Sequence, residues 1–269
     1  MSYEFEIDRQ NFDLDMTLDC GQCFRFFRRE KSGWTGTVRN KTIMVNQIGD
    51  RLIFENITRD EFESFWRGYF DLDTDYVEIN RLLYRVPQLR DAINFAGGIR
   101  ILRQEPWETL CSFIISQNNN IKRIKGIIGR LCEMFGKRLP GGGFAFPSPA
   151  ALSGLTVEDL VPLRSGFRAK YILDAARRVH DGQVDLHALE SLPTEQCYTE
   201  LEKILGVGRK VADCVMVYGY HRLEALPRDV WVRRAMAELF PAGMPEEILP
   251  YAGVAGQYLF HWIRVNSRA

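Results

Sequence analysis

From Asp75 onward the 269-residue sequence contains almost no β-rich runs, and its apolar residues recur at helical spacing. This periodicity predicts helices that bury one apolar face against their neighbours. The predicted helices span residues 76–84, 107–116, 122–135, 157–163, 170–180, 195–205, 210–218, 230–239 and 255–265. Residues 139–149 contain three consecutive glycines and three prolines, so we expect a loop there.

The first hundred residues have a different pattern. Three short β-rich runs, at residues 34–38, 42–46 and 51–55, are separated by pairs of turn-forming residues. Aromatic residues at helical spacing follow in 60–69, with Thr58 as the candidate N-cap. The sequence therefore predicts an α+β chain. A twisted antiparallel sheet with helices would occupy residues 1–99, and an all-helical unit residues 100–269.

The charge of the chain is unevenly distributed. Thirty-five basic residues balance thirty-five acidic ones overall. However, residues 1–99 have 13 basic and 17 acidic side chains, whereas residues 100–269 have 22 and 18. Six of the basic side chains lie within 117–138, where Glu133 is the single acidic residue. Such a patch suits a phosphate backbone, although a solvated helix face is the alternative.

Cysteine content and hydropathy indicate in which cellular compartment the protein is expected. Six dispersed cysteines do not resemble a disulfide scaffold, and the Cys20-Gly21-Gln22-Cys23 spacing has no second pair to complete a zinc site. We therefore expect reduced, structural thiols. No run of 18 apolar residues and no apolar signal core occur, so we expect no membrane association. The expected location is intracellular, cytoplasmic and nucleoid-associated if the source is bacterial.

The most specific local pattern is the turn Gly206-Val207-Gly208, which joins two predicted helices in a hairpin at residues 205–210. Glycines permit backbone conformations that other residues avoid and let another molecule approach closely. The N–H groups and dipole at the start of the second helix favour an anion. An ordinary glycine-capped turn between packed helices is the alternative. The hairpin favours binding to a DNA backbone without sequence readout.

Two residues beside this hairpin suggest chemistry. Lys210 stands in the first turn of the second helix, where the helix dipole disfavours an ammonium and so favours the nucleophilic free amine. Asp229 precedes the helix predicted from residue 230, so it could be an N-cap. A carboxylate there could also stabilise positive charge that develops on a sugar as a glycosidic bond breaks.

The sequence 205–214, followed by 227–230, resembles the helix-hairpin-helix DNA glycosylases with a downstream aspartate, and most closely the 8-oxoguanine DNA glycosylases. Further matching motifs occur in order at residues 20–25, 66–73, 113–121, 165–171 and 255–260. The resemblance implies a TBP-like sheet domain followed by a helical HhH-GPD glycosylase domain. It also implies excision of 8-oxoguanine from duplex DNA with abasic-site lyase activity, no organic cofactor, no catalytic metal and action as a monomer. A monovalent cation at the hairpin carbonyls remains open.

The resemblance assigns roles to residues of the reacting site. Lys210 would attack the sugar C1′, expel the base and form a Schiff base that permits β-elimination. Asp229 would assist ionisation of the sugar. Gly21 would offer its carbonyl to the N7–H of the oxidised base, a proton that guanine lacks. Cys214 and Phe260 would sandwich the extruded base, although spacing alone would place both in the core.

Other matches concern the rest of the DNA. Asn118 would fill the gap left by the extruded base, with Phe167 as a wedge in place of the tyrosine of better-known relatives. Arg123 and Arg168 would contact the orphaned cytosine, although either could be surface charge. The hairpin residues Gly206, Val207 and Gly208 would bind phosphate. The expected partner is double-stranded DNA with an oxidised guanine, preferably opposite cytosine.

Two positions depart from the family pattern. Trp231 replaces a histidine near the lesion's phosphate, and Gly256 replaces the glutamine that reads the Watson–Crick edge of the base. Either the adjacent Gln257 takes over or water fills the space, and we expect open, water-filled space beside Gly256 because helical neighbours diverge by about 100°. Two alternative functions remain open: a glycosylase of this fold for another damaged base, and a non-enzymatic DNA-binding module.

Overall fold

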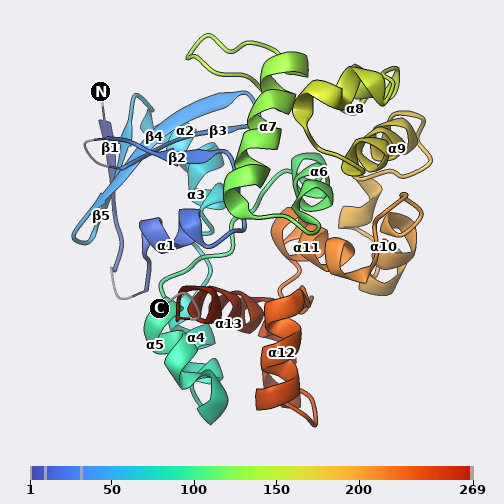
Figure 1. The fold of residues 1–269 in the computed structure, drawn as a ribbon. Helices are drawn as coiled ribbons and strands as arrows, with labels where there is room; N and C mark the ends of the chain where they lie inside the picture. Colours follow the sequence, from blue (N-terminus) through green and yellow to red (C-terminus); the bar gives the residue numbers. More distant parts are fainter. Residues whose placement is uncertain (1, 9–10, 31–32, 267–269) are drawn as a thin grey trace.

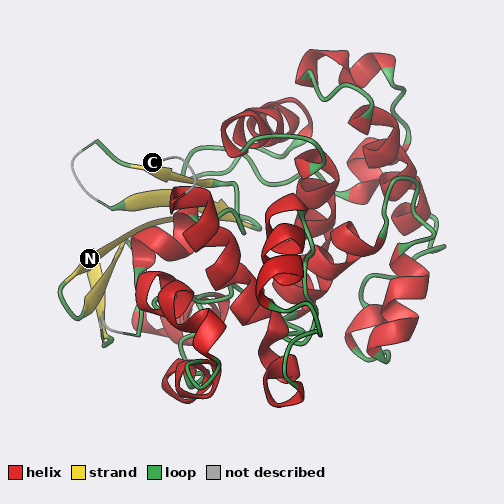
Figure 2. Ribbon diagram, turned by 60° about the horizontal axis from the view of Figure 1, so that its bottom comes forward, coloured by secondary structure: helices red, strands yellow, loops and turns green. Residues whose placement is uncertain are grey.

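The computed structural model describes residues 2–8, 11–30 and 33–266 of the chain. A five-stranded antiparallel sheet lies at one side of the molecule, and helices make up most of the rest (Figures 1 and 2). The predicted α+β architecture is confirmed. Within these described ranges, no helix is both long and apolar enough to cross a membrane.

The sheet contains the three predicted strands and two more. Its spatial order is β1-β5-β4-β3-β2, and every neighbouring pair is antiparallel. The strands are β1 (Ser2–Glu6), β2 (Phe26–Arg28), β3 (Trp34–Val38), β4 (Lys41–Ile48) and β5 (Arg51–Glu55). The two-residue turns at 39–40 and 49–50 connect β3 to β4 and β4 to β5, as predicted.

A helix over residues 59–69 covers the sheet. It consists of α2 (Arg59–Glu61), a π-helical turn η1 (Phe62–Trp66) and α3 (Arg67–Tyr69). The predicted N-cap is confirmed, because the Thr58 hydroxyl accepts the Glu61 N–H at 3.1 Å. Phe62 is fully buried, and its ring lies 5.0 Å from that of Phe54 on β5. This aromatic packing joins helix and sheet in one apolar core.

The remaining helices agree with the predicted series, with some differences. They are α1 (Leu14–Asp19), α4 (Tyr76–Leu83), η2 (Pro87–Leu89), α5 (Arg90–Ala96), α6 (Pro106–Ser116), α7 (Ile121–Phe135), α8 (Pro149–Ser153), η3 (Glu158–Leu163), α9 (Arg168–His180), η4 (Ala188–Glu190), α10 (Thr194–Leu201), α11 (Arg209–Tyr220), α12 (Val230–Leu239), η5 (Glu246–Tyr251) and α13 (Ala252–Asn266). The segment predicted at 157–163 is a 3-10 helix, since Pro162 lacks the N–H that a regular helix needs. The helix predicted at 195–205 ends at Leu201, ahead of the glycine turn.

A second, larger core joins the helices. It includes α4 and α5, which lie beside the C-terminal helix α13 (Figure 1). The Tyr258 hydroxyl of α13 donates to Asn80 Oδ1 of α4 at 3.0 Å. Residues 76–96 therefore pack with the end of the chain rather than with the sheet, and α13 is held from both sides.

All six cysteines are buried and free. Cys20 and Cys23 hydrogen-bond to backbone carbonyls, of Thr17 at 3.3 Å and Leu18 at 3.7 Å. Burial raises the pKa of Cys20 to about 12 and that of Cys23 still further, so both stay protonated at neutral pH. Their CxxC spacing therefore has a structural explanation: two neutral thiols fix the ends of the turn that contains Gly21.

Candidate active site

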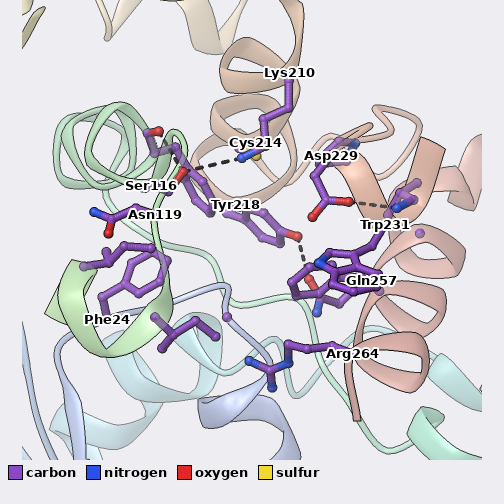
Figure 3. Close-up of a pocket in the computed structure, with 18 of the residues that line it drawn as sticks. Phe24, Ser116, Asn119, Lys210, Cys214, Tyr218, Asp229, Trp231, Gln257 and Arg264 are labelled. Carbon is purple, nitrogen blue, oxygen red and sulfur yellow. Dashed lines mark hydrogen bonds between the residues drawn. The ribbon is translucent and has the colours of Figure 1, made fainter. Parts of the chain in front are cut away.

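A cavity of about 300 Å³ opens where α6, α7, α11, α12 and α13 meet the turn at residues 20–24 (Figure 3). Its walls contain every residue predicted for catalysis or base binding. These are Gly21, Lys210, Cys214, Asp229, Gly256, Gln257 and Phe260. Residues up to 239 positions apart in sequence thus converge on one pocket. This pocket is the candidate active site.

Lys210 enters the pocket from the second position of α11, directly after the Gly208 N-cap. Its Nζ lies 3.4 Å from the hydroxyl oxygen of Ser116, at the end of α6, and 5.3 Å from the centre of the Phe113 ring. The amine is therefore held by a hydroxyl and an aromatic face, with no carboxylate among these contacts. A Lys amine in such a setting suits nucleophilic attack.

Asp229 faces the pocket from the start of α12, whereas Lys210 enters it from α11. It is the N-cap of α12, and its Oδ1 accepts the Val232 N–H at 2.8 Å. The predicted capping role is thus confirmed. Figure 3 shows the side chains of Asp229 and Lys210 entering the same pocket from neighbouring helices. The cap fixes the orientation of a carboxylate that also faces the cavity.

The face of α11 below Lys210 forms one wall. Cys214 and Tyr218 follow at intervals of four residues, so the three side chains lie one above the other. Burial raises the pKa of the Cys214 thiol to about 11, which keeps the thiol neutral at pH 7. A neutral thiol does not compete with the Lys210 amine as a nucleophile. Burial also raises the pKa of Tyr218, whose hydroxyl donates to Gln257 Oε1 at 2.5 Å.

Gln257 forms part of the opposite wall. It is 3% exposed, and its Nε2 donates to the Cys20 carbonyl at 3.2 Å, so both ends of the amide are held. An amide has two N–H groups and two acceptor lone pairs, which leaves a donor and an acceptor for a ligand. Gln257 reaches the pocket although α13 already begins at Ala252.

The expectation of open space beside Gly256 is wrong. A Cβ built on Gly256 would lie 2.4 Å from Leu226 Cδ1. Leu226 is 9% exposed and therefore fills this position from the segment that precedes α12. The Gln257 side chain reaches the pocket in spite of the angle between helical neighbours, and the segment before α12 closes the space beside Gly256. An amide at position 257 and an apolar group beside position 256 thus occupy the region.

Gly21 lies on the floor of the pocket in a conformation that favours glycine, with φ of +89°. A Cβ there would stand 3.2 Å from Ile121 Cδ1 and 3.4 Å from Phe260 Cε1. Glycine is thus favoured by the turn, and Phe260 lies at ordinary contact distance from it. The contact brings the predicted N7–H acceptor and the predicted stacking ring together.

The residues predicted to contact the rest of the DNA lie outside the lining of this pocket, in the turn between α6 and α7 and at the starts of α7 and α9. Asn118 has φ of +47° in the turn between α6 and α7, where a loop was predicted. Arg168 is 3% exposed and donates to the carbonyls of Gln117 and Asn118, the latter at 2.9 Å. Arg123 is exposed and donates to the Arg164 carbonyl at 2.9 Å. The two arginines therefore differ: Arg168 is buried and hydrogen-bonded to the turn between α6 and α7, whereas Arg123 is exposed to solvent.

Phe167 and the glycine hairpin complete the surface around the pocket. Phe167 is 47% exposed, and the Arg168 guanidinium lies over its ring at 4.4 Å. In the hairpin, Gly206 has φ of +80°, and a Cβ there would lie 2.4 Å from the Tyr171 ring. Gly208 has open space instead. Gly206 thus serves the fold, while Gly208 leaves room for another molecule.

Several pocket residues were missed by the sequence analysis, among them Phe24, Phe113, Ser116, Asn119, Tyr218 and Arg264. Two of these had a usable signal. Tyr218 lies eight residues after Lys210 on the same helix face, and Arg264 lies seven after Gln257 on α13. The others come from different elements, and nothing in their local sequence distinguishes them from core residues.

Two family models together match most of the chain. The model described as 8-oxoguanine DNA glycosylase, N-terminal domain, matches residues 4–110. The model described as HhH-GPD superfamily base excision DNA repair protein matches residues 111–248. The sheet unit and the helical unit are thus those of a helix-hairpin-helix base-excision protein.

Individual relatives show which family within this class of base-excision proteins the chain resembles. The chain is 32% identical over 265 residues to the N-glycosylase/DNA lyase of Saccharomyces cerevisiae, covering 87% of this chain and 70% of the yeast protein. The Clostridium acetobutylicum 8-oxoguanine glycosylase/lyase bound to DNA superposes with a TM-score of 0.90 at 39% identity, covering 99% of this chain and 98% of that one. MBOgg1 with a low-affinity DNA ligand gives 0.92 at 39% identity, covering 99% and 96%. The chain belongs to the 8-oxoguanine DNA glycosylases of the HhH-GPD superfamily, a family of N-glycosylase/DNA lyase enzymes.

Proposed function

We propose that this enzyme removes 8-oxoguanine from duplex DNA with Lys210 as the nucleophile and then cleaves the abasic strand. The observation that carries the proposal is the convergence of Lys210 and Asp229 on one pocket whose floor is Gly21. An amine for the sugar, a carboxylate for the developing charge and a backbone acceptor for the base are thus within one cavity.

In the proposed chemistry, the Lys210 amine forms a bond to C1′ as the C1′–N9 bond breaks, and the base leaves with the bonding electron pair. Asp229 stabilises the positive charge that develops on the sugar. Loss of the amine proton and opening of the sugar ring give a Schiff base. Removal of a C2′ proton then breaks the C3′–O bond, which is β-elimination. The neighbouring Ser116 hydroxyl positions the amine before attack.

Base selection in this proposal depends on the walls of the cavity. The Gly21 carbonyl accepts the N7–H of the oxidised base and repels the N7 lone pair of guanine. Cys214, a neutral thiol, and Phe260 lie on the two faces of the base. Gln257 offers its remaining donor and acceptor to the Watson–Crick edge. Extrusion of the base costs a few kcal/mol, which these contacts offset.

We further propose that the enzyme prefers the lesion opposite cytosine. The related Clostridium acetobutylicum structure contains cytosine opposite to 8-oxoG. The exposed guanidinium of Arg123 beside the Asn118 turn supplies donors that match the acceptors of cytosine.

Single-turnover release of free base from matched duplexes tests the function. We expect 8-oxoguanine opposite cytosine to be excised at least tenfold faster than the same duplex carrying 3-methyladenine, uracil or undamaged guanine. Faster release of another base would overturn the substrate assignment. Release of 8-oxoguanine without strand cleavage would overturn the lyase step alone.

A further inference from the structure

Arg264 is a pocket residue with no role in the chemistry described so far. It lies on α13, seven residues after Gln257 and four after Phe260, so all three side chains lie toward one side of the helix. Its guanidinium is 5.7 Å from the centre of the Phe260 ring. A cation therefore lines the cavity proposed for the base.

The guanidinium is fixed in orientation. Nη2 donates to the Asp19 carbonyl at 2.7 Å and lies 3.3 Å from His261 Nδ1. Burial, together with the charge of Arg264, lowers the pKa of His261 to about 4, so the imidazole is neutral at pH 7 and Nδ1 can accept. Nη1 lies 3.9 Å from the position of a Cβ built on Gly21. The guanidinium is thus close to Gly21, the residue whose carbonyl is the proposed N7–H acceptor.

The position of Arg264 in the pocket indicates which oxygen atom of the base it would contact. In 8-oxoguanine, O8 and O6 flank N7–H: O8 lies on the ring that carries the glycosidic bond, and O6 lies on the other ring. The glycosidic bond must face Lys210 for attack at C1′. Figure 3 shows Arg264 at the end of the pocket remote from Lys210, with Gln257 between them. With N7–H at Gly21, O6 is the acceptor at this end.

We propose that Arg264 determines specificity by donating a hydrogen bond to O6 of the extruded base, an assignment that rests on the proposed function. Oxidised adenine shares N7–H and O8 with oxidised guanine but presents an amino group at position 6. That group is a donor, and it would meet the donor face of the guanidinium. Arg264 therefore favours the 6-oxo base and opposes the 6-amino base, which the Gly21 carbonyl alone cannot distinguish.

A structural role is the competing explanation, because Arg264 also holds the Asp19 carbonyl next to Gly21. Loss of that contact would displace the Gly21 turn and impair every base with an N7–H by the same factor. The ratio of rates for two such bases therefore separates the two explanations, whereas a single rate does not.

The test measures single-turnover excision of 8-oxoguanine and 8-oxoadenine, each opposite cytosine, by the unmodified enzyme, Arg264→Met and Arg264→Lys. In Arg264→Met we expect the 8-oxoguanine rate to fall roughly 10- to 100-fold, the effect of one charged hydrogen bond. The 8-oxoadenine rate should be unchanged or higher, and Arg264→Lys should be intermediate. Arg81→Met, which removes an exposed arginine paired with Glu78 on α4, is the matched control and should change neither rate.

Folding and function are checked separately. Affinity for a duplex with an abasic analogue, which presents no base, should be the same for Arg264→Met and the unmodified enzyme. Equal loss of both rates, or an unchanged 8-oxoguanine rate, would overturn the role of Arg264. Failure of the unmodified enzyme to excise 8-oxoguanine would instead overturn the proposed function, whatever the variants do.

Discussion

Asp229 combines two tasks in one carboxylate, because it caps α12 and faces the pocket. Asparagine caps helices as well as aspartate does, whereas alanine does not. We therefore expect Asp229→Asn to melt like the unmodified enzyme and Asp229→Ala to lose about 1 kcal/mol of unfolding free energy. Both should slow base release by roughly 100-fold or more. Thermal melting and single-turnover rates measure the two effects, and a normal rate in Asp229→Asn would leave only the capping role.

The neighbours Gly256 and Gln257 should respond in opposite ways to substitution. Gly256→Gln forces Leu226 to move, so we expect a loss of about 1–3 kcal/mol in stability and no gain in base discrimination. Gln257→Ala should slow excision of 8-oxoguanine roughly tenfold, because it removes a held hydrogen-bonding group from the wall. Chemical denaturation and excision rates test this. Sharper discrimination in Gly256→Gln would show that the space is available after all.

At the level of elements, the glycine hairpin separates a structural from a binding position. Gly206→Ala would place a methyl group against Tyr171 at positive φ, so we expect a loss of about 1–3 kcal/mol in stability. Gly208→Ala meets no protein atom within 4 Å and should melt normally. It should nevertheless weaken duplex binding, since the added methyl group lies where a phosphate would approach the start of α11. Equal duplex affinity of Gly208→Ala and the unmodified enzyme would remove the hairpin from the DNA interface.

The two arginines near the Asn118 turn should also differ. Arg123→Ala should reduce the preference for cytosine opposite the lesion while leaving the melting temperature unchanged, because its side chain is exposed. Arg168→Ala should lower the melting temperature as well, since it removes the donor to the Gln117 and Asn118 carbonyls. Excision rates opposite each of the four bases, together with melting curves, measure both. Full cytosine preference in Arg123→Ala would contradict its assignment.

The elements that sequence could predict are those with a strong period. Strands β3 to β5 alternate and are joined by two-residue turns, and the long helices have continuous apolar faces. The missed elements lack such a period: β2 has three residues, α1 has six, and β1 is a short edge strand. Their structure depends on partners distant in sequence, as when β1 pairs with β5. The Leu226 contact with Gly256 was likewise invisible, because no local pattern brings two elements together.

For the whole molecule, a buried carboxylate joins the helical unit to the sheet unit. Asp71, with its side chain 1% exposed, accepts hydrogen bonds from His221 at 2.9 Å and Arg103 at 2.9 Å. Burial alone would raise the pKa of Asp71, but the hydrogen bond and charge of His221 outweigh it and hold that pKa below its usual value. His221 ends α11, the helix that carries Lys210.

The depressed pKa of Asp71 predicts a pH dependence of stability. A carboxyl whose pKa is lower in the folded state contributes stability above its unfolded pKa and loses it as the pH falls through the folded value. We expect Asp71→Asn to cost roughly 3 kcal/mol at pH 7, because it removes the buried carboxylate that faces the buried His221 and the half-exposed Arg103. The difference from the unmodified enzyme should shrink below about pH 4. Denaturant titrations between pH 3 and 7 measure it, and a pH-independent difference would contradict an ionised Asp71 in the folded state.

The central claim is that Lys210 forms the covalent intermediate with the sugar. Borohydride reduction during reaction with an 8-oxoguanine duplex should trap a protein–DNA adduct, and peptide mass mapping should locate it at Lys210. Lys210→Gln should abolish trapping but bind the duplex with nearly unchanged affinity, because the hairpin contacts remain. An adduct of undiminished yield in Lys210→Gln, or one mapped to another amine, would contradict the account.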